Sequence, residues 1–228
     1  MMASNNFNGL SAYASSKEAQ LRSFRKRRFL GELRKKNDVV MCQETHLNEN
    51  DKKYLNNNED GSMVFYNNGK DKSAGVATII GKRLCMIYNP IKMDLNNDAE
   101  GRVLSIYMEP KTDKHRGFYI DNVYLQSGSI MAPKHRQISS LRHNSDDLVF
   151  MGGDFNFTER EGDGGTKLTG KTDALWQDYC LRMGMKEVHQ GAHTYRKGDA
   201  SSRLDRFYMN LDRGRPTGIL PGDLPGKG

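Results

Sequence analysis

Short apolar segments bounded by turn residues recur along the middle of this chain, and they limit the folds that it can adopt. Few of them are separated by the ten or more helical residues that a parallel crossover needs, so antiparallel pairing should dominate. With helices expected toward both ends, the pattern predicts an α/β layered sandwich. The expected strands are Met63 to Tyr66, Gly75 to Ile80, Met86 to Tyr88, Arg102 to Met108, Gly117 to Tyr124 and Leu148 to Met151.

Helix signals are concentrated toward the two ends of the chain. The strongest covers Ser16 to Lys36, where Leu21, Phe24 and Leu33 mark the expected core-facing side. The arginines and lysines on the rest of this helix suit a solvated face, which we favour over a nuclear-import or phosphate-binding segment. Further helices are expected over His135 to Arg142 and Thr172 to Met183, and further strands over Asp38 to Cys42, Val188 to Tyr195 and Arg203 to Met209.

The charge of the chain indicates an anionic partner. The formal net charge is +7 and the isoelectric point is near 9.2, which favours nucleic acid or a membrane surface. The longest apolar run, Ala74 to Ile80, is too short to span a bilayer, and no signal peptide is recognisable. Three widely spaced cysteines offer neither a disulfide framework nor a zinc spacing, which indicates a reducing compartment. We therefore expect a single soluble intracellular domain over residues 1–228.

Two polar residues follow a pair of glycines in the run VFMGGDFNF, residues 149–157. Side chains two apart in an extended segment point the same way, so Asp154 and Asn156 should project together into a cleft. Gly152 and Gly153 remove side-chain bulk where the backbone is approached closely or where φ is positive. A carboxylate beside a neutral amide suits hard-metal or phosphate chemistry, although a Gly-Asp-x-Asn string also makes a good turn.

The same arrangement, a strand ending in polar groups, is expected at four places. They are NFNGL from Asn6, QETH from Gln43, GDFN from Gly153 and SRLDR from Ser202, with NVY from Asn122 between them. In this order the segments resemble the endonuclease/exonuclease/phosphatase family of metal-dependent phosphoesterases. The runs QETHL, GGDFNF and SSRLDRFY are most similar to the endonuclease domain of non-LTR (LINE-type) retrotransposons. The resemblance spans nearly the whole chain and implies a four-layered α/β/β/α sandwich of two mainly antiparallel sheets.

The resemblance also implies a catalytic role for individual residues. Phosphodiester hydrolysis needs a divalent cation to neutralise phosphate charge and to support the leaving oxygen. By resemblance, Glu44 holds Mg²⁺, with Mn²⁺ as an alternative, and Asn6 helps to place the metal or its water. Asp154 would orient or deprotonate the attacking water, and Asn156 would hold the scissile phosphate. Tyr124 would donate its hydroxyl to the charge that develops at phosphorus.

A hairpin just before the Arg-Leu-Asp segment is expected to contact DNA. In retrotransposon endonucleases such a hairpin reaches the minor groove, and here it would span His193 to Ser202, although a plain surface turn explains its tip equally well. The implied partner is double-stranded DNA, in the nucleus if the source is eukaryotic, with a reverse transcriptase domain elsewhere in the parent element. The oligomeric state is not indicated. The candidate contacts are Thr194, Arg196, Lys197, Ser202 and Arg203.

The end of the chain departs from the family pattern. The family ends in a Ser-Asp-His motif whose histidine is the partner of an aspartate, which by resemblance is Asp205. The 23 residues after Asp205 contain no histidine, and three of the six prolines lie in the final 13 residues. No strand is expected through such a segment. The last strand is therefore expected to be missing or altered, with an atypical region over about 213–228.

Three functions stay open on these grounds. The first is a divalent-metal-dependent endonuclease that nicks target DNA for a non-LTR retroelement. The second is a catalytically impaired DNA-binding remnant, because a basic cleft would survive the loss of the histidine. The third is another phosphoesterase of the same fold. The basic charge and the expected hairpin favour DNA over the substrates of the third class.

Overall fold

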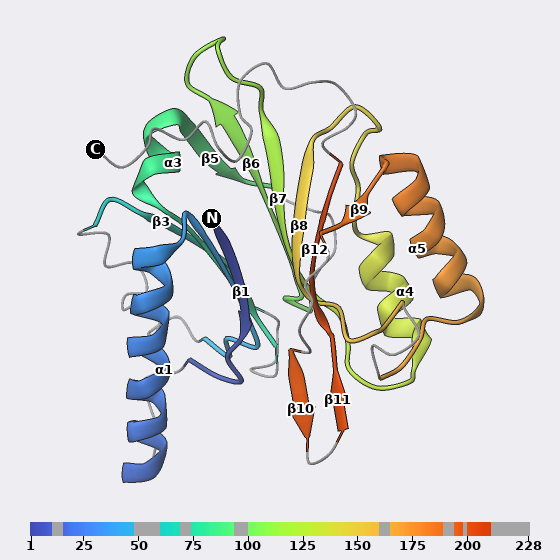
Figure 1. The fold of residues 1–228 in the computed structure, drawn as a ribbon, viewed down its shortest axis with the longest axis horizontal. Helices are drawn as coiled ribbons and strands as arrows, with labels where there is room; N and C mark the ends of the chain where they lie inside the picture. The colour runs from blue at the N-terminus through green and yellow to red at the C-terminus, as the bar shows by residue number, and fades with distance from the viewer. Residues whose placement is uncertain are drawn as a thin grey trace.

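Two β-sheets lie face to face, with helices on both outer sides, in the computed structural model (Figure 1). It describes residues 1–10, 16–47, 60–68, 74–93, 100–159, 165–188, 194–197 and 200–210. Helix α1 (Lys17–Lys36) covers the smaller sheet, and helices α4 (Met131–Ser139) and α5 (Gly170–Met183) cover the larger one. The four α/β/β/α layers implied by the resemblance are confirmed.

The strands pair mainly antiparallel, as predicted, and the exceptions are the parallel pairs β1–β2 and β7–β8. The smaller sheet has the order β1 (Met2–Asn6), β2 (Val39–Gln43), β4 (Val76–Ile80), β3 (Met63–Asn67). The larger sheet has the order β5 (Tyr88–Lys92), β6 (Val103–Pro110), β7 (Phe118–Tyr124), β8 (Val149–Asp154), β12 (Asp205–Met209), β9 (Lys186–Glu187). The predicted change in the last strand falls on residues outside the described ranges.

Apolar side chains fill the spaces between the layers. Met41 of β2 and Ile106 of β6 belong to the cluster between the two sheets, and both are fully buried. On the outer side of the larger sheet, Trp176 of α5 packs edge to face against Tyr208, with ring centroids 5.1 Å apart. Burial of this apolar surface is the main source of stability. No helix in the described ranges is long and apolar enough to cross a membrane.

The predicted strand over Met86 to Tyr88 is wrong in its first part. Residues Lys82–Ile87 form the short helix α3, and strand β5 begins only at Tyr88. The segment is a short apolar run without clear periodicity, so it fits a helix or a strand equally well. The helix predicted from His135 instead begins at Met131, because Pro133 is tolerated in a first helical turn.

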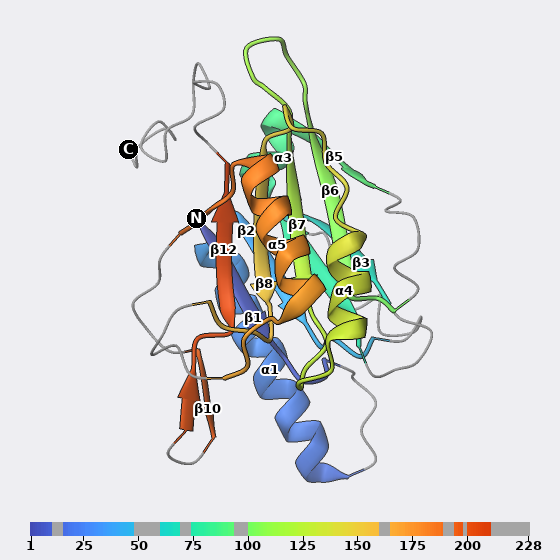
Figure 2. The same ribbon diagram turned by 90° about the vertical axis from the view of Figure 1, so that its right-hand side faces the viewer.

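The predicted core-facing side of α1 is correct at Leu33, which packs against the core cluster beneath the helix, but wrong at Leu21 and Phe24. Leu21 and Phe24 are 50% and 58% exposed, whereas Ser23 and Leu30 are buried. Only the second half of the helix lies against the smaller sheet, and the first half extends past the ends of its strands (Figures 1 and 2). Apolar side chains on that half therefore have no sheet to pack against.

A β-hairpin projects from the same end of the sandwich as the start of α1 (Figures 1 and 2). Its strands β10 (Tyr195–Lys197) and β11 (Ala200–Ser202) pair antiparallel. This hairpin lies where the sequence predicted it, directly before β12. Two projections thus flank one end of the two sheets.

A buried ion pair stands behind the larger sheet. His143 Nε2 lies 2.7 Å from Asp121 Oδ2, and the two side chains are 1% and 0% exposed. Burial acts to lower the pKa of His143, but the Asp121 carboxylate outweighs it and the pKa is raised. The pair therefore stabilises the fold most where the histidine is charged.

Replacing Asp121 with asparagine should lower stability mainly at acidic pH. The contribution of a histidine whose pKa is raised is complete below its unfolded pKa of about 6.5, and it is lost as the pH rises through the folded value. Removing one partner of a buried pair costs about 3–5 kcal/mol, so we expect a loss of that order at pH 5.5 and a smaller loss at pH 8.5. Urea unfolding at both pH values measures the difference. An equal loss at both would contradict the prediction.

Candidate active site

The predicted catalytic residues come together at one end of the two facing sheets. Asn6, Tyr124 and Asp154 are the last residues of β1, β7 and β8, and Glu44 directly follows β2. The parallel pairs β1–β2 and β7–β8 bring these strand ends together, one pair in each sheet. Asp205 begins β12, which runs antiparallel to β8, so Asp205 lies opposite Asp154. The strand topology thus collects residues that are far apart in sequence.

Two hydrogen bonds join the sheets at this end. The side-chain amide of Asn6 donates to Asp154 Oδ2 at 3.0 Å. The hydroxyl of Tyr124 donates to Glu44 Oε1 at 2.5 Å. The amide oxygen of Asn6 also accepts the backbone N–H of Asn8 at 3.0 Å, which fixes the orientation of its side chain. Asn6, Glu44, Tyr124 and Asp154 are therefore each held by a partner in the opposite sheet.

Directly behind the site, Gln43 and Asn122 form a buried polar bridge between the sheets. Both side chains are fully buried, and Gln43 Nε2 donates to Asn122 Oδ1 at 2.7 Å. The amide nitrogen of Asn122 lies within hydrogen-bond distance of three acceptors on β2 and β4, which are the carbonyls of Ala77 at 2.9 Å and Cys42 at 3.2 Å and Thr78 Oγ1 at 3.2 Å. Buried amides need such partners to offset lost hydration. The bridge fixes the two sheets relative to each other next to Glu44.

Asp154 and Asn156 are close together, but not for the reason that the sequence suggested. Strand β8 ends at Asp154, and Asn156 has a φ of +49°, so the alternation of a strand does not extend to it. The Asp154 carboxylate instead accepts the backbone N–H of Asn156 at 3.1 Å, as in a tight turn. The Asn156 side chain donates to the carbonyl of Leu125 at 2.9 Å. Asp154 thus ends a strand as predicted, but the expected same-side projection of Asp154 and Asn156 along an extended segment is wrong, because the backbone leaves the extended conformation at Asn156.

Two aspartates of the site, Asp154 and Asp205, have raised pKa values. Burial raises the pKa of Asp154, and the nearby charge of Glu44 raises it further, against the hydrogen bonds of Asn6 and Asn156. Burial and the charge of Asp154 raise the pKa of Asp205 to about 7. One carboxylate oxygen of Asp205, Oδ1, is buried and has no hydrogen-bond partner among the residues that the structure describes. The site therefore concentrates negative charge that the described residues leave partly uncompensated.

Tyr124 is held as a proton donor. Burial raises the pKa of its hydroxyl, and the hydrogen bond to Glu44 raises it further. The guanidinium of Arg102 lies 4.6 Å from the centre of its ring. A phenol in this state stays protonated at neutral pH, as donation to an anionic oxygen requires.

Two basic residues beside the site were not predicted from the sequence. Lys134 of α4 is completely buried, and its ammonium donates to the carbonyls of Gln126 and Gly128 at 2.5 and 2.7 Å. Burial lowers the pKa of Lys134, and the charge of Asp154 opposes that effect. Lys134 and Arg102 thus place positive charge beside the acidic cluster. A lysine in a polar stretch after Pro133 gives no sequence signal of burial.

The predicted DNA-contacting residues are in different situations. Thr194 is exposed, and its hydroxyl oxygen accepts the backbone N–H of Asp205 at 3.0 Å. Ser202 and Arg203 are only 6% and 2% exposed, and Arg203 forms an ion pair with Glu187. The guanidinium of Arg203 is therefore buried in an ion pair and is not exposed to contact a phosphate. The side chains of Arg196 and Lys197 lie outside the described part of the chain, although their backbone forms β10.

The donor set fits a hard divalent cation. Within the described ranges, no three histidine, cysteine, aspartate or glutamate side chains are grouped so that they alone could hold a metal. Mg²⁺ needs only one or two carboxylates, because it keeps most of its waters. Glu44 would supply one carboxylate ligand, and the amide oxygen of Asn6 would supply a neutral oxygen ligand. Asp205 Oδ1, which is buried without a hydrogen-bond partner among the described residues, and the neighbouring carboxylates of Asp154 and Glu44 are oxygen groups that a cation would stabilise.

This sandwich, with oxygen-bearing side chains at the ends of both sheets, is the architecture of a class of nucleases and phosphoesterases. The family described as "Endonuclease/Exonuclease/phosphatase family" matches residues 6–226, and the chain belongs to it. The match extends through the region in which the sequence has no histidine after Asp205.

Solved structures share the fold at low sequence identity. The endonuclease domain of TRAS1, a telomere-specific non-LTR retrotransposon, has a TM-score of 0.59 and 12% identity, with 92% of this chain and 83% of that chain covered. The 3′ phosphatase NExo from Neisseria, bound to a product DNA hairpin, has a TM-score of 0.61 and 17% identity over 91% and 85% of the chains. Humanized D. rerio TDP2 has a TM-score of 0.55 and 16% identity over 90% and 81%. A comparison with curated protein sequences finds no significant match.

Proposed function

We propose that this protein is a Mg²⁺-dependent DNA endonuclease that nicks target DNA for a non-LTR retroelement. The observation that carries the proposal is the convergence of Glu44, Asn6, Tyr124 and Asp154 at the ends of four strands, beside a hairpin. The net charge of +7 favours a polyanionic substrate. The structural likeness to a retrotransposon endonuclease domain supports the choice of biological role. In that role the protein would act in the nucleus, beside a reverse transcriptase domain of the same element.

Each residue has a distinct part in the proposed reaction. Glu44 and Asn6 would hold the cation, which supplies charge neutralisation on the phosphate and supports the leaving oxygen. Asp154 would orient the attacking water and accept its proton, because its carboxylate is fixed by Asn6 at 3.0 Å. Tyr124 would release its hydrogen bond to Glu44 and donate to a phosphate oxygen as charge develops there. Asn156 would position the scissile phosphate.

The proposal is tested by nicking of supercoiled plasmid in the presence of Mg²⁺. We expect open circles from the unmodified protein, none in the presence of a chelator, and a loss of rate of about 10²–10⁴-fold for Asp154→Ala. A matched control is Asp178→Ala, because Asp178 is an exposed aspartate on α5. That variant should nick at the unmodified rate. Nicking that survives either the chelator or Asp154→Ala would contradict the proposed mechanism.

One observation favours a second candidate, a DNA-binding remnant with impaired catalysis. Asp205 Oδ1 is buried without a hydrogen-bond partner in the described part of the chain, and residues 206–228 include no histidine. The family pattern described above would place an imidazole against this carboxylate. Retention of plasmid DNA without nicking would favour the remnant, and restoration of nicking by added imidazole would identify the missing group.

A further inference from the structure

The first half of α1 is strongly basic and almost unneutralised. Arg22 and Arg25 are exposed, and neither forms a hydrogen bond or ion pair with the described part of the chain. Arginine side chains left free in this way attract phosphate groups. From residue 17 to residue 28 there is one acidic side chain, Glu18, against the basic side chains Lys17, Arg22, Arg25, Lys26, Arg27 and Arg28.

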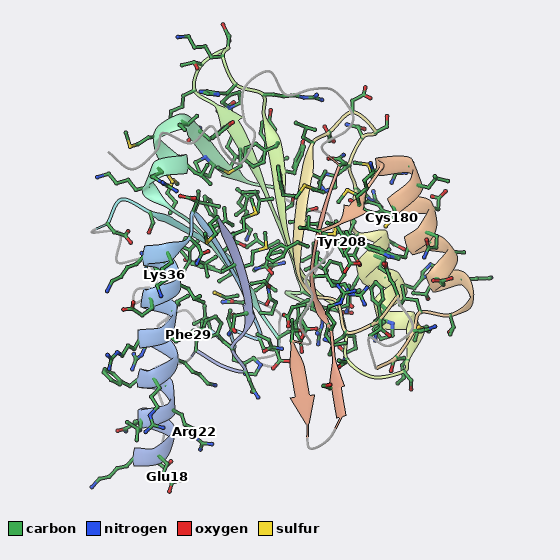
Figure 3. The ribbon with its side chains drawn as sticks, viewed as in Figure 1. Glu18, Arg22, Phe29, Lys36, Cys180 and Tyr208 are labelled. Carbon is green, nitrogen blue, oxygen red and sulfur yellow. The ribbon has the colours of Figure 1, made fainter. Side chains whose placement is uncertain are left out.

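This basic half of the helix lies beyond the body of the protein. The second half of α1 is anchored by Leu30, which is buried, and by Arg34, which pairs with Asp60. The first half extends past the strand ends, toward the same side as the β10–β11 hairpin (Figures 1 and 2). Figure 3 shows Arg22 near the free end of the helix and Lys36 at its far end.

Lys26 connects this basic half to the candidate active site. Its ammonium donates to the carbonyls of Asn8 and Gly9 at 2.5 and 3.1 Å, directly after the catalytic candidate Asn6. Burial and the charge of Arg22 lower the pKa of Lys26, and the charge of Glu44 acts to raise it. Lys26 therefore lies near both residues. Arg22 lies one helical turn before Lys26, so the two share a side of the helix. Positive charge therefore extends from Lys26, which lies near Glu44, outward along α1 to Arg22.

We propose that the first half of α1 is an arm that binds phosphates of duplex DNA to one side of the scissile bond, with Arg22 and Arg25 as its main contacts. The proposal rests on the proposed function, because it requires DNA as the substrate. Twelve helical residues extend for about 18 Å, which matches about five base-pair steps of 3.4 Å. The arm and the hairpin would contact the duplex on opposite sides of the site.

An anionic membrane is the other surface that such a helix could bind. Leu21 and Phe24 are exposed beside the arginines, as in helices that lie on membranes. DNA is favoured because the basic residues reach the candidate active site through Lys26, which lies near Glu44. A helix that only binds a membrane would not need basic residues next to the active site. Vesicle binding is therefore included as an outcome of the test.

The experiment is the salt dependence of binding to a duplex of about 20 base pairs, in a chelator so that no cleavage occurs. The test variant is R22Q/R25Q, and the matched control is K35Q/K36Q, which removes the same charge from the other end of the same helix. Each phosphate contact contributes about 0.9 to the slope of log K against log salt. We expect the slope to become shallower by about 1.8 for R22Q/R25Q and to stay unchanged for K35Q/K36Q.

The outcomes separate this proposal from the proposed function. Equal slopes for the two variants, while the unmodified protein still nicks plasmid, would overturn the arm and leave the endonuclease intact. A shallower slope for R22Q/R25Q without nicking by the unmodified protein would support the arm in a DNA-binding remnant. Loss of binding to vesicles of anionic phospholipid by R22Q/R25Q, with duplex binding unchanged, would overturn the proposal in favour of a membrane surface.

Discussion

Gly153→Ala is expected to abolish the folded protein, although the change adds a single methyl group. Gly153 has a φ of +144°, a backbone conformation that residues with a side chain rarely adopt. Its added Cβ would overlap the backbone of Val123, which is the neighbour of Gly153 in the parallel β7–β8 pair. The backbone of the central strands cannot move away without breaking that pairing. We expect a loss of more than about 4 kcal/mol in the free energy of unfolding.

The measurement is the yield of soluble protein together with the urea midpoint. The matched control is Gly31→Ala, because a Cβ at Gly31 meets nothing within 4 Å and the residue lies inside α1. Alanine in a helix interior is favoured over glycine by about 1 kcal/mol, so the control should be slightly more stable. A soluble Gly153→Ala protein with an unchanged midpoint would show that the close approach of β7 and β8 is not required.

Asp205→Asn should have the opposite effect and make the protein more stable at alkaline pH. The folded state raises the pKa of Asp205 to about 7 from its usual 3.8, through burial and the charge of Asp154. Between these values the folded state binds more protons than the unfolded state, so stability falls as the pH rises. At about 1.4 kcal/mol for each pH unit, the cost at pH 8 is about 4 kcal/mol. Asparagine carries no charge and removes that cost.

Thermal unfolding in a chelator between pH 4 and pH 8 measures this effect. The melting temperature of Asp205→Asn should exceed that of the unmodified protein at pH 8, and the difference should nearly vanish near pH 4, where the pH is close to the unfolded pKa of 3.8 and little of the cost has accrued. A gain of the same size at both pH values would show that packing, not charge, is responsible. The expected gain would mean that the chain keeps a carboxylate at a cost in stability, as functional sites often do.

The sequence was most informative where local pattern and chemistry agree. The helix at Lys17–Lys36 and most strands were predictable, because their apolar spacing and bounding turn residues are clear. The positions of Glu44, Asp154 and Asp205 followed from motifs that end or begin strands. Their convergence followed from the resemblance, since no periodicity in one chain specifies which strand ends meet.

Other features depended on tertiary packing that no local pattern records. Leu21 and Phe24 follow a helical spacing, yet that half of α1 passes beyond the sheet. The burial of Lys134 and the ion pair of Arg203 with Glu187 arise from contacts between distant segments. An isolated charged residue in a sequence is ordinarily predicted to be exposed, so these two positions could be found only in three dimensions.

The buried Gln43–Asn122 bridge separates the chemistry of this molecule from its specificity. The bridge aligns the two sheets through hydrogen bonds in the interior. Gln43 is one residue before Glu44, and Asn122 is two residues before Tyr124. The spacing of these two groups is therefore independent of the hairpin and of the surface segments around the site. Such segments can be lengthened, shortened or exchanged without moving the reacting groups. A molecule built in this way can acquire new target preferences through its surface loops while it retains one reaction.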